Sequence, residues 1–185
     1  PPLTPKKNLE MHKSYNNIDL IVNRRLVRLA NKNISLKTTS NTKKTVLLMN
    51  NGTLSLSSLI SELLFKIPYQ KDWEFLLRSE QLSDTDKKQA LQRNDFKIIT
   101  GLTNTHMSIA SSDIILARGG YNILSELLAL NKPAVLINED FNPEIKSNLA
   151  LAEEYSNFKI AYKNDALEIL QSIINSNMTI DANFK

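Results

Sequence analysis

Two adjacent glycines, Gly119 and Gly120, separate the apolar run 113–117 from a helical pattern over 121–130. The first N–H groups of a helix have no partner within it and carry partial positive charge, so they form a natural phosphate site. Glycines at that junction let the chain turn with positive φ and let a ligand approach the backbone. Glu126 lies six residues after Gly120, where a carboxylate can accept two hydrogen bonds from a vicinal diol such as that of ribose. This spacing favours a nucleotide site over the alternatives, a ligand-free turn and a surface glutamate.

The other two glycines of the chain also follow apolar runs, Gly52 after 45–50 and Gly101 after 96–100. The carboxyl ends of parallel strands meet at one edge of a sheet, and open α/β sheets bind ligands there. Thr53 adds a hydroxyl beside Gly52 at a second expected helix start. Neither a Gly-Lys-Ser/Thr loop ending nor a G-x-G-x-x-G motif occurs, which argues against a Walker loop and an ordinary NAD site. We therefore expect a ligand edge built from three loops, with tight βα turns as the alternative explanation.

These loops need a fold that brings them together, and the chain from residue 45 onward alternates between strand and helix patterns. Strand-like runs occupy 45–50, 73–77, 96–100, 113–117, 134–138 and 158–162. Helical patterns occupy 51–67, 83–94, 104–112, 121–130, 144–155 and 165–176. Asn131-Lys132-Pro133 is expected to end the fourth helix, because proline disfavours a helical residue before it. We predict an α/β fold: a Rossmann-like, doubly wound, mainly parallel six-stranded sheet with helices on both faces.

The composition limits the other kinds of site. The chain has 185 residues, 42% hydrophobic and 23% charged, which fits a soluble globular domain, and no apolar run reaches the roughly 18 to 20 residues that span a bilayer. The absence of cysteine excludes a disulfide, a thiolate nucleophile and a Cys-based metal site, and it is compatible with a reducing cytoplasm. The only histidines, His12 and His106, lie too far apart for a local metal motif. We expect no metal, and we expect His106 to be a packed or surface side chain rather than a catalytic base.

Charge divides the chain into segments. Residues 1–44 hold ten Lys and Arg against Glu10 and Asp19, and so carry a net charge of +8. We interpret 1–44 as a basic linker, 45–176 as the ligand-binding domain and 177–185 as a C-terminal tail. The basic linker favours phosphates, anionic lipid headgroups or nucleic acid, with a solvated linker as the alternative. The aromatic residues are scattered over strand positions and form no stacking platform, so we expect no nucleic-acid partner.

The stretch DIILARGGYNILSELLALNKPAVLI, residues 113–137, is similar to the signature of the C-terminal domain of family 28 glycosyltransferases. This family includes the peptidoglycan N-acetylglucosaminyltransferase and predicted relatives with an R-G-G-Y-N-T-x-x-E-x-L segment. The resemblance extends from about Thr45 to Asn175. It implies the donor-binding half of a two-domain GT-B enzyme, which holds a nucleotide sugar, commonly UDP-linked, with no cofactor or required metal. The enzyme would transfer a hexose or N-acetylhexosamine to an acceptor held by a missing N-terminal domain or subunit.

The resemblance also implies roles for individual residues. It places Gly119, Gly120 and Asn122 by the diphosphate, Gly52 and Thr53 near the phosphates, and the loop of Thr100, Gly101, Leu102 and Thr103 near the base. Arg118 belongs to the same signature, and Glu126 would bind the ribose diol. Arg24 or Arg25 would reach the phosphates from the basic linker. The acceptor and the catalytic base are not identified by these residues.

The chain departs from the family pattern in two loops. The first loop has less glycine than is usual, and the His-Gln pair expected after the fifth strand is replaced by FNPEIKSNLALAEE, with Glu144 and Ile145 near those positions. Two other functions therefore stay open: a nucleotide-sugar epimerase or hydrolase of the same fold, and a non-catalytic interaction module with a decayed site. The start Pro-Pro-Leu-Thr-Pro suggests a cut inside a longer protein. We expect a cytoplasmic protein, with the basic linker on an anionic membrane face if the acceptor is lipid-linked.

Overall fold

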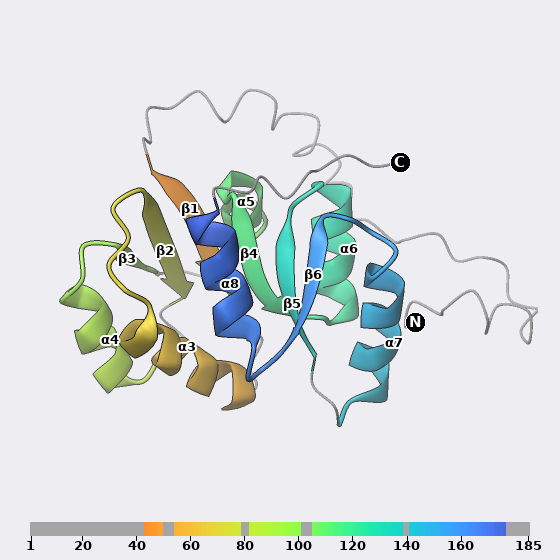
Figure 1. Cartoon of the computed structure of the whole chain (residues 1–185), viewed down its shortest axis with the longest axis horizontal. Helices are drawn as coiled ribbons and strands as arrows, with labels where there is room; N and C mark the ends of the chain where they lie inside the picture. The colour runs from red at the N-terminus through yellow and green to blue at the C-terminus, as the bar shows by residue number, and fades with distance from the viewer. Residues whose placement is uncertain (1–42, 50–53, 79–81, 101–104, 139–140, 177–185) are drawn as a thin grey trace, which may run out of the picture.

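The computed structural model describes residues 43–49, 54–78, 82–100, 105–138 and 141–176 (Figure 1). The linker predictions, including the roles of Arg24 and Arg25, lie outside the described residues. Within the described part of the chain, no helix is long and apolar enough to cross a membrane.

In the described residues, six strands form one sheet in the order β3-β2-β1-β4-β5-β6, and all five pairings are parallel. The strands are β1 (Lys44–Leu48), β2 (Trp73–Arg78), β3 (Phe96–Ile99), β4 (Ile114–Arg118), β5 (Ala134–Asn138) and β6 (Phe158–Tyr162). The helices are α3 (Leu54–Lys66), α4 (Asp84–Leu91), α5 (Thr105–Ser111), α6 (Tyr121–Ala129), α7 (Pro143–Ala152) and α8 (Ala166–Asn175). The predicted doubly wound α/β fold is confirmed, and the sheet is parallel throughout rather than mainly parallel.

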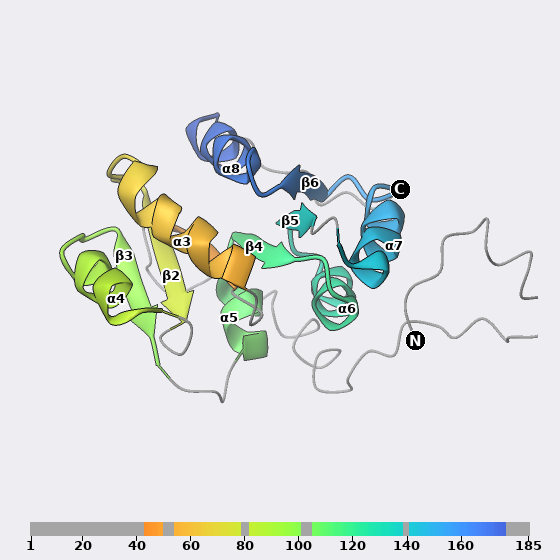
Figure 2. The same cartoon turned by 90° about the horizontal axis from the view of Figure 1, so that it is seen from below.

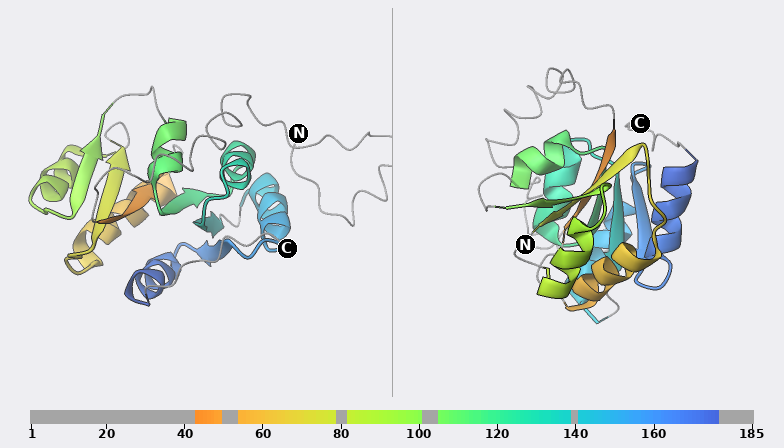
Figure 3. Two further views of the ribbon diagram at one scale, coloured as in Figure 1. Left: turned by 90° about the horizontal axis from the view of Figure 1, so that it is seen from above. Right: turned by 90° about the vertical axis from the view of Figure 1, so that its left-hand side faces the viewer.

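Helices cover both faces of the sheet, which explains the unbroken apolar runs of the central strands (Figures 2 and 3). Successive residues of a strand point to opposite faces. In β1, Val46 and Leu48 join the cluster that includes residues of α3 and α8, while Leu47 joins the cluster that includes residues of α5, α6 and α7. These three strand side chains are at most 1% exposed. The two clusters hold the strands between helices on both faces of the sheet.

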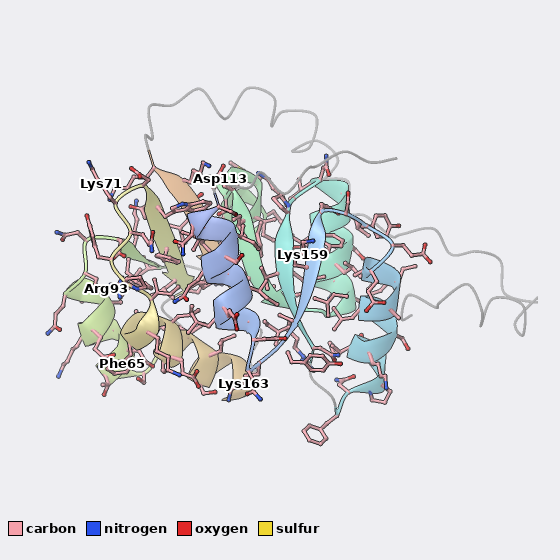
Figure 4. The ribbon with its side chains drawn as sticks, in the orientation of Figure 1. Phe65, Lys71, Arg93, Asp113, Lys159 and Lys163 are labelled. Atoms are coloured by element: carbon pink, nitrogen blue, oxygen red, sulfur yellow. The ribbon has the colours of Figure 1, made fainter. Side chains whose placement is uncertain are left out.

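Two strand boundaries differ by one residue from the predicted ones. β4 begins at Ile114, one residue after the predicted start. Asp113, labelled in Figure 4, comes just before β4, and its Oδ2 accepts a hydrogen bond from the N–H of Thr45 at 2.8 Å. β2 extends to Arg78, one residue beyond the predicted end, and this extension brings a guanidinium group to the carboxyl edge of the sheet.

The end of α6 shows why Asn131 precedes Lys132 and Pro133. Asn131 has φ of 48°, a left-handed conformation that asparagine tolerates better than most residues. The N–H of Lys132 donates to the carbonyl of Leu127 at 2.9 Å, and the N–H of Asn131 donates to the carbonyl of Leu128 at 3.1 Å. This pair of bonds is a Schellman cap. The helix ends at Ala129, one residue before the predicted end, and the left-handed asparagine closes it before the proline is reached.

Arg93 and Asp95 form a buried ion pair between α4 and β3 (Arg93 is labelled in Figure 4). The guanidinium donates to both carboxylate oxygens of Asp95, at 3.0 and 2.7 Å, and to the carbonyls of Leu64 and Ile67 at the end of α3. The N–H of Gln70 donates to the same carboxylate at 3.0 Å. Burial alone would raise the pKa of Asp95, but the hydrogen bonds from Arg93 and Gln70 and the charge of Arg93 lower it. This network joins the end of α3, the start of β3 and the loop before β2.

Candidate functional site

A pocket of about 590 Å³ opens at the carboxyl edge of the sheet. It lies where the chain, having passed from β1 through β2 to β3, returns to the other side of β1 as β4. Parallel sheets bind ligands at such a switch point, because the loops after the two strands diverge there. The lining residues are Met49, Arg78, Thr105, Arg118, Gly120, Tyr121, Asn122, Ile123, Glu126 and Glu144. They come from the residue after β1, from the ends of β2 and β4, from the starts of α5 and α7 and from α6, so the pocket lies over the central strands β2, β1 and β4 of the sheet edge.

The start of α6 faces this pocket. Gly120 is the N-cap residue, and no described side chain caps the helix there. Tyr121, Asn122 and Ile123, the first three helical residues, all line the pocket. Their N–H groups precede the first intrahelical donor, Leu124, which donates to the carbonyl of Gly120 at 3.0 Å. The helix start can therefore donate hydrogen bonds to an anion in the pocket.

The start of α7 is different. Its N-cap residue, Asn142, accepts hydrogen bonds from the N–H groups of Glu144 and Ile145 at 3.0 and 3.3 Å. Pro143 occupies the first helical position and has no N–H group. The donors at this helix start are already used, so Glu144 brings only its carboxylate to the pocket.

Gly119 and Gly120 are small for different reasons. A Cβ atom on Gly119 would overlap the side chain of Leu149 on α7, and the buried amide of Asn148 donates to the Gly119 carbonyl at 3.3 Å. A Cβ atom on Gly120 would meet nothing within 4 Å. Neither glycine has the positive φ that we expected, and Gly120 has φ of −73°. Gly119 therefore lets α7 pack closely, while Gly120 keeps the mouth of the pocket open; only Gly120 is among the lining residues.

Two arginines bring positive charge to the pocket. Arg118 ends β4, and Arg78 ends β2. The Nη1 of Arg78 donates to the Oγ1 of Thr105 at 2.7 Å, so the first residue of α5 holds this guanidinium in place. Guanidinium groups match the geometry of phosphate and carboxylate oxygens. Arg78 is not among the predicted site residues, because the predicted strand ends at Leu77; a charged residue directly after a buried apolar run is the signal that could have indicated it.

Glu126 lies one turn into α6 and is also in the pocket, with its side chain 19% exposed. Its Oε1 is 3.4 Å from the Nδ1 of His106 on α5. Burial raises the pKa of Glu126, while the charge of His106 and its polar contact act in the opposite direction. His106 is partly buried, as expected, but the contact with Glu126 was not expected. A carboxylate that is withdrawn from water and faces a pocket suits the recognition of a hydroxyl-rich ligand.

The structure brings together some of the predicted site residues. Arg118, Gly120, Asn122, Glu126 and Glu144 line one pocket. Thr100 is exposed at the end of a described segment and is not among the lining residues. Gly52, Thr53, Gly101, Leu102 and Thr103 lie outside the described residues, so their predicted roles stay predictions. Among the described residues, no three acidic or histidine side chains gather into a metal site.

The chain is similar in sequence to one protein family and in structure to several solved proteins. Residues 50–179 match the family model of the glycosyltransferase family 28 C-terminal domain. No curated protein sequence matches the chain. Among solved structures, the chain is similar to MurG from Acinetobacter baumannii, with 12% identity, a TM-score of 0.58 and coverage of 83% of this chain. It is also similar to the glycosyltransferase SnogD from Streptomyces nogalater, with 16% identity, a TM-score of 0.49 and coverage of 77% of this chain.

The likeness to MurG shows a shared fold over part of the longer protein. This chain covers 45% of MurG and 38% of SnogD. The matched part of each structure is therefore less than half of its chain.

Proposed function

The chain belongs to the glycosyltransferase family 28 C-terminal domains, and from this premise we propose that its pocket binds a nucleotide sugar, most simply a UDP-sugar. One observation supports this proposal above all. The pocket at the switch point combines an uncapped helix start, two guanidinium groups and a partly buried carboxylate. The first two features suit a diphosphate and the third suits a ribose diol.

The proposal gives each group one part of the donor. The diphosphate lies at the start of α6 beside Gly120 and Asn122, where the missing side chain of Gly120 leaves the backbone accessible. Arg118 and Arg78 neutralise its charge. Glu126 accepts the two hydroxyl hydrogens of the ribose. The base then extends toward the loop 100–103, as the family resemblance implies.

The proposed reaction is displacement at the anomeric carbon of the sugar. The bond between this carbon and the diphosphate oxygen breaks with its electron pair, and an acceptor oxygen forms the new bond after losing its proton to a base. Negative charge grows on the departing diphosphate. Helix N–H groups and guanidinium groups aimed at that charge stabilise it, which is the usual way a protein assists such a departure. These groups supply the positive charge without a metal or other cofactor.

The acceptor side of the reaction needs partners outside this domain. We propose that a second domain or subunit holds the acceptor and its base, since the chain covers less than half of the MurG chain it resembles. For a lipid-linked acceptor at the cytoplasmic face, the net charge of +8 over residues 1–44 would favour an anionic membrane surface. Sedimentation with anionic vesicles at low and high salt tests this part separately.

Calorimetric titration with UDP and with uridine tests the proposed function. UDP should bind much more tightly than uridine, because only UDP places phosphates at α6. Glu126→Ala should weaken UDP binding by about 1.5 to 3 kcal/mol, the range for hydrogen bonds to charged groups. The matched control is Glu168→Ala, which removes an exposed glutamate from α8. Equal affinity for UDP in the parent and Glu126→Ala would remove the diol role, and no UDP binding at all would favour a non-catalytic interaction module.

A further inference from the structure

We infer that His106 is a positioning residue for Glu126: it holds the carboxylate of Glu126 ionised inside the pocket and so extends nucleotide binding to lower pH. This inference rests on the proposed function of the pocket. It goes further because it assigns a role to a residue on a different helix, α5, that is not itself among the lining residues.

The geometry of the pair supports this role. The Nδ1 atom of His106 is buried and has no hydrogen-bond partner among the described residues. The Oε1 atom of Glu126 lies 3.4 Å from it, within ion-pair distance. The side chains are 31% and 19% exposed, so solvent screens their interaction only in part. Because the contact lacks hydrogen-bond geometry, it depends mainly on charge, and it stabilises the ionised Glu126 carboxylate while His106 is protonated.

Other charged groups reach the same pocket from other elements. Arg78 on β2 and Arg118 on β4 favour an ionised Glu126, Glu144 on α7 disfavours it, and Tyr121 on α6 adds a phenol. These groups remain when His106 is replaced. A substitution of His106 alone therefore isolates its effect on Glu126.

The direction of the effect follows from the environment of Glu126. Burial raises the pKa of Glu126, and His106 opposes that rise. Without His106 the pKa of Glu126 should rise further, so that the carboxylate takes up its proton at a higher pH. A protonated carboxyl group has lost part of its capacity to accept hydrogen bonds from a diol. The parent chain should therefore retain UDP affinity to a lower pH than a chain without His106.

The position of α5 adds support. Its first residue, Thr105, holds the guanidinium of Arg78 through the 2.7 Å hydrogen bond, and its second residue is His106. Two consecutive side chains thus contact the groups proposed to bind the phosphates and the diol. The first turn of α5 therefore contacts both a group proposed to bind the diphosphate, Arg78, and the group proposed to bind the ribose, Glu126.

The first experiment needs no ligand. The carboxyl carbon of Glu126 is titrated by NMR in the labelled parent chain, in His106→Ala and in His106→Asn. Asparagine is the matched variant because its amide can donate from about the place of Nδ1 but cannot carry a charge. The midpoint for Glu126 should move to higher pH in His106→Ala and also in His106→Asn. Ser111→Ala, an exposed substitution on the same helix, should leave the midpoint where it is in the parent.

The second experiment measures UDP affinity across the same pH range. In the parent, affinity should fall as the pH falls through the midpoint of Glu126. In His106→Ala this fall should begin at higher pH, with affinity about 2- to 10-fold weaker near the parent midpoint, as for the loss of one modest polar interaction. At high pH, where Glu126 is ionised without help, His106→Asn should bind UDP about as tightly as the parent. Near the parent midpoint of Glu126 it should bind UDP more weakly than the parent.

The outcomes separate the inference from the proposed function. An unchanged or lower midpoint for Glu126 in His106→Ala would overturn the role of His106. A raised midpoint in a chain that binds no UDP would support the effect of His106 on Glu126 and overturn the nucleotide site. A raised midpoint with an unshifted UDP profile would overturn the link between the pair and binding.

Discussion

Asp95 and Glu126 are two carboxylates that the fold withdraws from water at different places. Asp95 lies just before β3, where strands begin, and is fully buried. Glu126 lies on α6 beside the pocket at the edge where strands end, with its side chain 19% exposed. Asp95 receives two hydrogen bonds from Arg93 and one from the N–H of Gln70. Among the described residues, Glu126 has one ion-pair contact, with the Nδ1 of His106 at 3.4 Å, which is charged when His106 is protonated.

Because their partners differ, the pKa values of the two carboxyl groups shift in opposite directions. Burial raises the pKa of a carboxyl group, and it does so for Glu126 because His106 compensates only partly. For Asp95 the hydrogen bonds from Arg93 and Gln70 outweigh burial, and the pKa falls. The carboxylate of Asp95 is held by groups that pack the domain. The carboxylate of Glu126 keeps the capacity to accept further hydrogen bonds. A buried carboxylate with saturated partners indicates structure, whereas one with unused capacity beside a pocket indicates binding.

The largest effect should come from breaking the structural pair. Arg93→Ala leaves Asp95 buried without its counter-ion and removes the donors to Leu64 and Ile67. Breaking such a buried pair costs about 3 to 5 kcal/mol of unfolding free energy. Urea unfolding measures it, with Lys66→Ala as the control because Lys66 and Glu62 form an exposed pair. A loss below about 1 kcal/mol, typical of a surface pair, would contradict the structural role.

The two adjacent glycines also differ in role, since Gly119 serves packing and Gly120 lines the pocket, and the expected effects are smaller. Gly119→Ala pushes a methyl group into Leu149, which is 2% exposed and has little room to move. We expect a loss of about 1 to 3 kcal/mol in unfolding free energy, as for other overpacked sites. Gly120→Ala should leave stability nearly unchanged, and Gly120→Val should weaken UDP binding more than uridine binding. Equal losses of both ligands in Gly120→Val would indicate that Gly120, like Gly119, serves packing.

The smallest effect should appear in the dependence of stability on pH. Asp95 has a lowered pKa, so its contribution is present above the ordinary Asp value of about 3.9 and is lost as the pH falls through its folded value. Glu126 has a raised pKa, so stability should increase as the pH falls through its folded value toward the ordinary Glu value of about 4.3. Urea unfolding from neutral to acid pH measures how the free energy of unfolding depends on pH. Asp95→Asn should remove the slope that comes from Asp95, and Glu126→Gln the slope that comes from Glu126. Slopes of the same sign for both groups would contradict the comparison.

The sequence predicted those parts of the molecule that depend on local pattern. Apolar runs of strand length and their alternation with helices led to the parallel sheet, because burial on both faces leaves a continuous signature along the chain. The placement of Gly120 and Glu126 in one pocket followed from their spacing around a helix start, and that of Asn122 followed from the family resemblance. Such features are determined within about twenty residues of the chain, as in the run 113–137.

The rest of the site depends on distances between segments that the sequence does not encode locally. Arg78 reaches the pocket because β2 pairs with β1, and Thr105 then holds it from α5. His106 contacts Glu126 because α5 and α6 pack on the same face of the sheet. Spacing also could not distinguish Gly119 from Gly120, since Leu149, which separates their roles, lies on α7.

A crystal structure of the chain with UDP would show whether the pocket is the donor site. The diphosphate should lie at the start of α6, within hydrogen-bond distance of its first N–H groups and of the guanidinium of Arg118 or Arg78. The ribose hydroxyls should lie on Glu126, with His106 still in contact with the carboxylate. UDP bound away from this pocket, or bound in it with the ribose turned away from Glu126, would overturn the proposed donor site.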